Sequence, residues 1–337
     1  MILNFEQLRK ITLGAVEMAE DEQGIHFHRF TKEQREIYEK RGLNAKVRST
    51  SGVQLRFRTD SNYLALAVCT TPGTTRTYFA FDVLINGVRI GTLDNFSHVE
   101  LPQNYPPVEL PLGEYSKQFD LGDGMKEVRI VFPWSVIAVL QKLELDDGAV
   151  IEPAKPEKKL LCFGDSITHG YDALYPANKY ASLLADFLGA EEFNKAIGGE
   201  RFWPELAQTK ENFQPDYITV AYGTNDWSGC TAEVLTGNCE AFYRNLATTY
   251  PNVPIYAITP IWRKGSDVSN QCGPFTIVEE TIRKATAPFE NITVISAIDF
   301  VPHDENYFAD LRLHPNDKGF APYFECLSQA ITERRAL

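Results

Sequence analysis

The sequence lacks an apolar stretch long enough to cross a membrane. Its longest apolar runs, such as residues 217–222, are far shorter than the ~20 residues that a bilayer requires. The amino terminus, residues 1–10, also lacks the basic segment followed by an apolar segment that marks a secretory signal. We therefore expect no membrane association, and we expect the protein in the cytoplasm.

Basic residues are outnumbered by acidic ones. Lys and Arg total 33 and Asp and Glu total 45, so the net charge is −12. An acidic surface repels nucleic-acid phosphates and anionic lipid headgroups, which argues against partners of either kind. Neither sign of charge forms a long run, so we interpret the charge as promoting solubility.

The six cysteines include no CxxC pair. A chain of 337 residues can bury large cores without disulfides, so reduced thiols are expected. Cys230, Cys239 and Cys272 form a loose cluster in the sequence, but zinc sites usually have tighter, paired spacing. We therefore expect no metal site.

The sequence divides into two halves with different patterns of apolar and polar residues. Domains commonly contain about 150 residues, so the length of the chain predicts roughly two domains. In the first half, residues 1–152, short segments from about Arg48 onward alternate apolar and polar residues between turn signals, and Asn86-Gly87 is a strong hairpin signal. This half is predicted to be an antiparallel β-sandwich, jelly-roll-like, with one helix over residues 31–41 capped by Thr31.

Residues 153–159 are polar and contain two prolines, which is typical of a linker. Residues 160–337 then alternate strand-like and helix-like segments, which predicts a three-layer α/β/α domain around a parallel sheet. We expect strands over 160–163, 192–196, 217–222, 255–259 and 292–296, and helices over 175–188, 240–250, 276–288 and 316–335.

Polar residues follow the strands of this second half, where parallel sheets bind ligands. Ser166 comes directly after the first strand, within Gly164-Asp165-Ser166, and is either an exposed nucleophile or part of a helix cap. Gly199 follows the second strand and either allows a close approach to a ligand or forms a tight turn. Asn225 follows the third, as an amide donor or an Asx-turn residue.

A histidine and a carboxylate precede the closing helix. Asp310 and His314-Pro315 could supply a general base and the group that orients it, or they could simply belong to a helix start. Two other histidines are weaker candidates. His169 is too close to Ser166 in the sequence to reach it easily as a base, and His303 lacks the His-Pro context.

These segments, taken in order, resemble the four motif blocks of the SGNH (GDSL-type) hydrolase family. The resemblance covers residues 158 to the carboxyl end and implies a flavodoxin-like fold and a serine acyl-hydrolase site without cofactor. It implies that Ser166 is the nucleophile and His314 the base, with an oxyanion hole formed by Ser166, Gly199 and Asn225. The family's acid precedes the histidine by three residues, whereas Asp310 precedes it by four. A one-residue bulge would still bring its carboxylate to His314; without the bulge, the site is a Ser-His dyad.

The substrate is indicated only weakly. The candidates for contacting it are residues next to the motif blocks or after strand ends: Asp165, Arg201, Trp227 and Trp262. A β-sandwich ahead of such a domain is similar to two-domain carbohydrate esterases and some acyltransferases. We therefore expect an esterase that removes a small acyl group, acetyl in the first place, from a neutral small-molecule or carbohydrate ester. An acyltransferase and a glycan-binding module with an inactive fold are the alternatives. The natural ester and the oligomeric state stay open.

Overall fold

The computed structural model describes residues 1–335, which form two compact units. The first unit comprises residues 1–157 with two later segments, 174–178 and 191–193, and the second unit comprises the rest. Strand β11 (Glu152–Pro153) still pairs with a strand of the first unit, and β12 begins at Lys158. The connection outside strands is therefore shorter than the expected linker.

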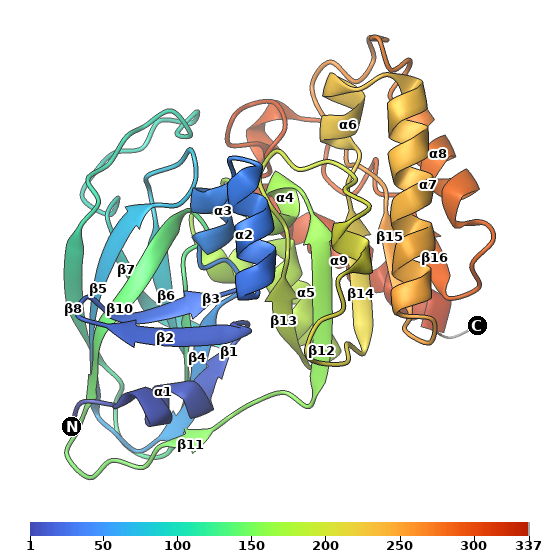
Figure 1. Ribbon diagram of the computed structural model, residues 1–337. Coiled ribbons are helices and arrows are strands. Elements are labelled where there is room, and N and C mark those ends of the chain that lie inside the picture. Colours follow the sequence, from blue (N-terminus) through green and yellow to red (C-terminus); the bar gives the residue numbers. More distant parts are fainter. Residues whose placement is uncertain (336–337) are drawn as a thin grey trace. The chain divides into compact units, whose positions relative to one another are not determined.

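The first unit contains two antiparallel sheets, one of five strands and one of six, the sixth being β11 paired with β4. Figure 1 shows their strands as arrows in blue to green. One has the order β2-β3-β10-β5-β8 and the other β1-β4-β9-β6-β7. Strand β3 pairs with β10, β4 with β9, β5 with β8, and β6 with β7. A long hairpin wrapped over itself gives this order, and it defines a jelly roll. The expected sandwich is confirmed. Its strands are β1 (Thr12–Leu13), β2 (Glu17–Asp21), β3 (Gly24–His28), β4 (Gln54–Thr59), β5 (Tyr63–Pro72), β6 (Ala80–Ile85), β7 (Val88–Asp94), β8 (Glu114–Asp120), β9 (Lys126–Val131) and β10 (Val136–Leu145).

Local sequence accounts for several of these elements. Leu64, Leu66 and Val68 alternate along β5 and are buried in the core between the sheets, because side chains of a strand point to opposite faces. Asn86 and Gly87 have φ of 49° and 83° and join β6 to β7, as the hairpin signal predicts.

Three helices accompany the sandwich: α1 (Phe5–Ile11), α2 (Lys32–Lys40) and α3 (Asn44–Arg48). The Thr31 hydroxyl accepts a hydrogen bond from the Gln34 N–H, and the Gln34 side chain accepts one from the Thr31 N–H. This capping box satisfies two backbone donors at the start of α2, so the predicted cap is confirmed.

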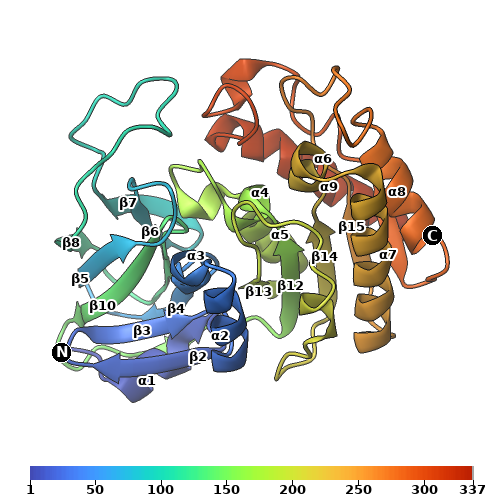
Figure 2. The ribbon, with the colours of Figure 1, turned by 45° about the horizontal axis from the view of Figure 1, so that its top comes forward.

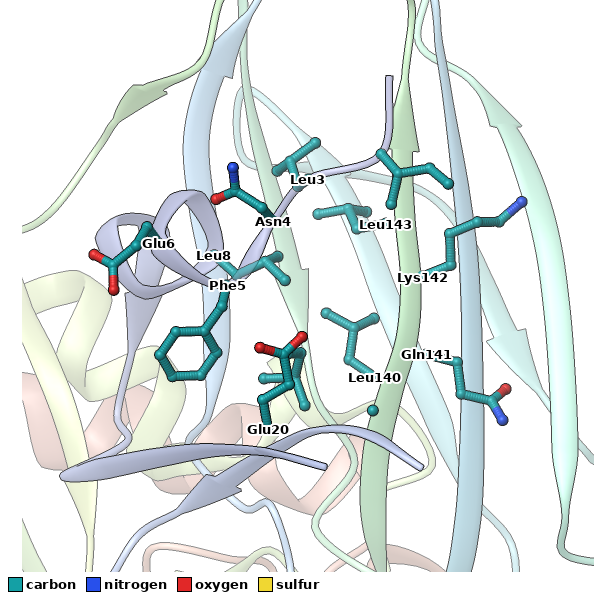
Figure 3. A pocket seen from close by; sticks show the side chains of 13 residues that line it. Leu3, Asn4, Phe5, Glu6, Leu8, Glu20, Leu140, Gln141, Lys142 and Leu143 are labelled. Carbon is teal, nitrogen blue, oxygen red and sulfur yellow. The ribbon is translucent and has the colours of Figure 1, made fainter. Parts of the chain in front are cut away.

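A cavity of about 400 Å³ lies in the first unit, between its amino-terminal segment and β10. Figure 3 shows that apolar side chains, including Leu3, Leu140 and Leu143, line it together with Glu20 and Lys142. Its lining includes no serine, histidine or cysteine.

The second unit has a five-stranded sheet in the order β13-β12-β14-β15-β16. Strands β12, β14, β15 and β16 pair in parallel. In chain order this is 2-1-3-4-5, the flavodoxin-like arrangement, whose ligands bind where the strand order reverses, between β12 and β14. The strands are β12 (Lys158–Gly164), β13 (Ala190–Asn194), β14 (Tyr217–Ala221), β15 (Ile255–Ile258) and β16 (Ile292–Ile295).

Helices cover both faces of this sheet (Figure 1). Leu160 and Cys162 of β12 share a core with α5 and α9, whereas the Phe163 ring contacts Phe242 of α7. Neighbouring residues of one strand thus face different helix layers, which confirms the three-layer prediction. The helices are α4 (Ser166–His169), α5 (Tyr180–Leu188), α6 (Thr224–Gly229), α7 (Ala232–Thr249), α8 (Ile277–Thr286) and α9 (Asp317–Arg335), with 3₁₀ turns η1 (Pro176–Asn178), η2 (Leu206–Gln208) and η3 (Glu305–Tyr307).

Three predicted boundaries were wrong. The helix expected over residues 175–188 is the turn η1 followed by α5, because Lys179 has extended backbone between them. The strand expected over 192–196 lies two residues earlier, and the helix expected over 240–250 begins two turns earlier. Within the described residues, no helix has the length and hydropathy that a bilayer crossing needs.

Candidate active site

Helix α4 follows β12 closely (Figure 2), and Ser166 is its first residue, with Asp165 as the N-cap. The carboxylate of Asp165 accepts the Ile167 N–H at 3.0 Å and caps this helix. A side chain at Gly164 would meet the Thr168 hydroxyl at 2.2 Å, so the tight turn from strand to helix requires glycine there. The turn presents both the hydroxyl and the backbone N–H of Ser166 at the carboxyl edge of the sheet.

Ser166, His314 and Asp310 form one hydrogen-bonded chain. The Ser166 Oγ lies 2.8 Å from His314 Nε2, and His314 Nδ1 lies 2.8 Å from Asp310 Oδ2. A carboxylate on Nδ1 favours the tautomer that leaves Nε2 able to accept a proton. This is the geometry that an activated serine needs, with a base beside the hydroxyl and a third group orienting the base.

The extra residue between Asp310 and His314 is accommodated by a left-handed turn. Leu311 has φ of 54°, which is uncommon for a residue with a side chain. Asp310 Oδ1 accepts the backbone N–H groups of Arg312, Leu313 and His314 at 2.7–3.0 Å. The carboxylate therefore holds the loop and reaches Nδ1, as the bulge hypothesis requires.

Electrostatics keeps Asp310 ionised. Burial alone would raise the pKa of its carboxyl. The hydrogen bond to His314, the charge of His314 and the backbone N–H groups of Leu313 and His314 outweigh burial and hold that pKa well below its usual value. The hydrogen-bonded series from Ser166 through His314 thus ends at a negatively charged carboxylate.

Gly199 follows β13 and Asn225 follows β14, and these two strands flank β12 in the sheet. Gly199 has φ of 86°, a conformation that favours glycine. The Asn225 amide donates to the Glu200 carbonyl at 3.0 Å, which joins the start of α6 to the loop that contains Gly199. An amide NH₂ carries two hydrogens, so one can hold this link while the other binds a substrate oxygen.

Residues 162–321 match the GDSL-like Lipase/Acylhydrolase family. These residues form a GDSL-like lipase/acylhydrolase domain. No curated protein sequence matches the chain. Solved structures with a similar fold match at low sequence identity, so the likeness shows the fold alone.

The structural relatives align over nearly the whole chain. The salicylyl-acyltransferase SsfX3 from a tetracycline biosynthetic pathway has a TM-score of 0.78 at 20% identity, covering 97% of this chain and 95% of its own. A Bacteroides ovatus protein assigned as a GDSL-like lipase has a TM-score of 0.74 at 17% identity, covering 99% and 97%. A family two carbohydrate esterase from Cellvibrio japonicus has a TM-score of 0.64 at 16% identity, covering 96% and 94%.

The four predicted substrate residues of the GDSL-like domain differ in their surroundings. Asp165 is buried and caps α4. Trp227 is also buried, and its indole N–H donates to the Gly273 carbonyl at 3.0 Å. Arg201 is exposed, and its guanidinium donates to the Cys230 sulfur at 3.4 Å. The Trp262 ring stacks on the His303 ring, with centroids 5.2 Å apart. Substrate contact by these four stays a prediction.

The two alternative histidines have other contacts. His169 is fully buried, and its Nδ1 accepts the Gly198 N–H at 3.3 Å. His303 is exposed, and its Nε2 lies 3.0 Å from the Ile298 carbonyl and 3.2 Å from the Asp299 carboxylate. These contacts give both rings structural partners, whereas the His314 ring contacts the Ser166 hydroxyl.

Sequence reasoning missed Asp172, a buried residue beside these hydrogen-bonded side chains, and a buried arginine, Arg263, lies near them. Asp172 is fully buried, with Oδ2 3.4 Å from His314 Nδ1. Arg263 is buried against the Trp227 ring and donates to Thr224 and Ser228. Asp172, Asp310 and His314 could offer three metal ligands within 4.8 Å of one another. The proton that joins His314 Nδ1 to Asp310 would have to leave first, so we retain the prediction of no metal.

Two buried carboxyl groups next to the motif blocks hold protons more tightly than usual. Burial raises the pKa of Asp165 to about 6 and that of Asp226 to about 7, and the charge of Asp165 adds to the shift of Asp226. Asp226 Oδ1 accepts the Phe202 N–H at 3.2 Å, whereas Oδ2 is buried without a hydrogen-bond partner among the described residues. Folding therefore favours the neutral form of Asp226.

Replacing Asp226 with asparagine should remove part of the pH dependence of stability. Between the unfolded pKa of about 4 and the folded value near 7, the folded state binds the extra proton, so stability falls as pH rises through this window. Asp226→Asn keeps the shape of the neutral acid. We expect its free energy of unfolding, relative to wild type, to rise by a few kcal/mol (about 1.4 per pKa unit) between pH 5 and pH 8.

Urea unfolding at both pH values measures this difference. Asp267→Asn, at an exposed aspartate of the same domain, is the control and should leave the pH dependence unchanged. An equal pH dependence in wild type and Asp226→Asn would contradict the prediction.

Proposed function

We propose that this protein is a serine esterase that removes a small acyl group from a carbohydrate or glycoside, and that its preferred acyl group is acetyl. The observation that carries the proposal is the chain from Ser166 Oγ to His314 Nε2 and from His314 Nδ1 to Asp310 Oδ2, with both steps at 2.8 Å. Its position at the strand-order reversal of a GDSL-like domain supports an acyl-transfer reaction.

In the proposed acylation step, Ser166 Oγ bonds to the ester carbonyl carbon while its proton moves to His314 Nε2. The carbonyl electron pair moves onto oxygen, and the resulting oxyanion is bound by the N–H groups of Ser166 and Gly199 and the amide of Asn225. When the tetrahedral intermediate collapses, His314 gives the proton to the leaving alcohol, and an acyl-Ser166 remains. The Asp310 carboxylate stabilises the imidazolium and does not itself become protonated.

In the proposed deacylation step, His314 takes a proton from water as the water oxygen attacks the acyl carbon. The same donors bind the second oxyanion, and the proton returns to Ser166 Oγ as the carboxylic acid leaves. Each oxyanion donor typically contributes about 2.7–4 kcal/mol to the transition state. The chain's own residues thus supply every group in both steps.

A series of p-nitrophenyl esters from acetate to octanoate tests the acyl preference. We expect kcat/KM to be highest for acetate and at least ~10-fold lower for octanoate, because a small pocket rejects added methylenes. Release of acetate from acetylated sugars tests the alcohol side of the proposal. Activity that rises with chain length would contradict the small-acyl assignment, and a lack of turnover with any ester would contradict the esterase proposal.

A second candidate function is acyl transfer from the same acyl-Ser166 to an alcohol. It is favoured by one observation, the fold shared over 97% of the chain with a protein named as a salicylyl-acyltransferase. Adding sugar or polyol acceptors to the ester assay separates the two functions. An esterase releases mainly free acid, whereas a transferase yields mainly the new ester.

A further inference from the structure

Two carboxylates, not one, face the imidazole of His314. Asp310 Oδ2 lies 2.8 Å from Nδ1 and Asp172 Oδ2 lies 3.4 Å from the same atom. The Asp172 side chain is fully buried, whereas that of Asp310 is 20% exposed. Because screening by water is weakest at a fully buried group, the Asp172 carboxylate acts on the ring at short range through little solvent.

The turn after the nucleophile brings Asp172 to this position. Helix α4 ends at Gly170, which has a left-handed φ of 110°, and the Tyr171 N–H donates to the Ser166 carbonyl at 2.9 Å. Asp172 then has φ of 71°. Aspartate tolerates the left-handed region better than most residues, but the conformation is uncommon and persists where surrounding structure enforces it. The segment that carries Ser166 thus also carries a carboxylate to His314.

Tyr171 closes one side of the same ring. Its ring centroid lies 5.5 Å from that of His314, at an interplanar angle of 31°, and the residue is 4% exposed. Water has little access from that side. The Nδ1 edge of the imidazole is therefore shared by Asp172 and Asp310, while the Nε2 edge faces Ser166.

We propose that Asp172 is a positioning residue for His314, a second acceptor for its Nδ1–H beside Asp310. The proposal rests on the proposed function. The Nδ1 proton stays on the ring throughout, and only the Ser166 proton moves, to Nε2 and onward to the leaving group. Asp172 keeps the proton on Nδ1 in the neutral ring and adds a second negative charge beside the imidazolium that each proton transfer creates.

A division of tasks follows from the contacts. Asp310 holds its loop through three backbone N–H groups as well as orienting the ring. In Asp310→Asn, the new amide can donate to Nδ1 and favour the wrong tautomer, which in a triad with a single acid costs about 10⁴-fold in kcat. Here Asp172 opposes that tautomer, so the single variant should retain more activity than a single-acid site would.

The test compares Asp172→Asn, Asp310→Asn and the double variant, using the full-length protein and p-nitrophenyl acetate. Asparagine adopts left-handed backbone as readily as aspartate, so Asp172→Asn changes the charge and leaves the turn intact. We expect kcat to fall about 10-fold in Asp172→Asn and about 10²-fold in Asp310→Asn, with KM little changed. The double variant should lose about 10⁴-fold, more than the product of the single losses.

The pH profile gives a readout that a purely structural role would not move. A negative charge within about 4 Å favours the imidazolium, so its removal should move the acid limb of kcat/KM to lower pH by ~1 unit. Asp165, which interacts electrostatically with His314, and Tyr171, whose ring packs against the imidazole, stay unchanged in all variants. Asp299→Asn is the matched control, because Asp299 lies 3.2 Å from His303 in an exposed pair of the same kind, and it should change neither kcat nor the profile.

Two results would overturn the proposal. One is a loss of about 10⁴-fold in Asp310→Asn alone; the other is an Asp172→Asn variant with wild-type kcat and an unmoved acid limb. If Asp172→Asn does not fold, Asp172→Gly removes the carboxylate at a position where glycine is unstrained. If wild type hydrolyses no ester, the proposed function is wrong, but the role of Asp172 can still be tested. Imidazole ¹⁵N spectra then test its contact with His314. The Nδ1–H signal of His314 should weaken or shift in Asp172→Asn, and an unchanged signal would refute the contact.

Discussion

Ser166→Ala is expected to abolish ester hydrolysis, with kcat falling by about 10⁶-fold, the size seen when a serine nucleophile is removed. The loss is large because no other group replaces the hydroxyl beside His314 Nε2, and the reaction then depends on binding and the oxyanion donors alone. The fold should be kept, since Asp165, not the Ser166 hydroxyl, caps α4. Steady-state assays with p-nitrophenyl acetate measure the loss.

A covalent probe separates a missing nucleophile from a misfolded site. A fluorophosphonate should label wild type at one serine, identified by mass spectrometry of peptides, and should leave Ser166→Ala unlabelled. Ser328→Ala is the matched control, because its hydroxyl donates to the Glu325 carbonyl on α9 and takes no part in the site. A Ser166→Ala variant with more than about 1% of wild-type activity would contradict the proposed acyl-enzyme, given the expected loss.

Much of the fold was predictable because local signals agree with the final structure. The Asn86-Gly87 turn needs positive φ at both residues, and few residue types adopt positive φ readily. The hairpin could therefore be predicted from these two residues alone. The N-cap at Thr31 could likewise be predicted from the residue type that precedes the helical segment. The parallel sheet with helices on both faces was predicted from the alternation of strands and helices, and the family resemblance implied a flavodoxin-like fold.

The wrong boundaries have non-local causes. Helix α7 begins at Ala232 although its first turns contain Thr236, Gly237 and Asn238, which are poor helix formers. Leu235 and Cys239 are fully buried there, so packing overrides propensity. The segment before α5 forms a 3₁₀ turn that belongs to the first unit, and its Tyr175 ring lies under the Arg89 guanidinium at 3.8 Å. No pattern within the segment itself encodes that contact.

The candidate site divides in the same way. Ser166, Gly199, Asn225 and His314 stand in motif blocks and could be picked out by spacing. Asp172 could not, because its place beside His314 depends on two left-handed residues, Gly170 and Asp172, that flank Tyr171 at the end of α4. A lone aspartate six residues after the nucleophile is an ordinary loop residue until the turn is known.

His314→Ala is expected to lose about as much activity as Ser166→Ala, about 10⁶-fold in kcat, because nucleophile and base act as a unit. The double variant Ser166→Ala/His314→Ala should then be no worse than either single one. Added imidazole can enter the space left by the ring and accept the Ser166 proton, so it should restore part of the activity of His314→Ala and none in the double variant.

His303→Ala distinguishes this role from that of an ordinary surface histidine. His303 also has a carboxylate partner, but its ring stacks on Trp262 and its Nε2 faces a backbone carbonyl. Because it has no serine to deprotonate, kcat should stay within about twofold of wild type, as for most exposed substitutions. A loss in His303→Ala comparable to that in His314→Ala would indicate that His303 is the base instead. Since Ser166 Oγ meets the His314 ring at 2.8 Å, we expect the loss in His314→Ala alone.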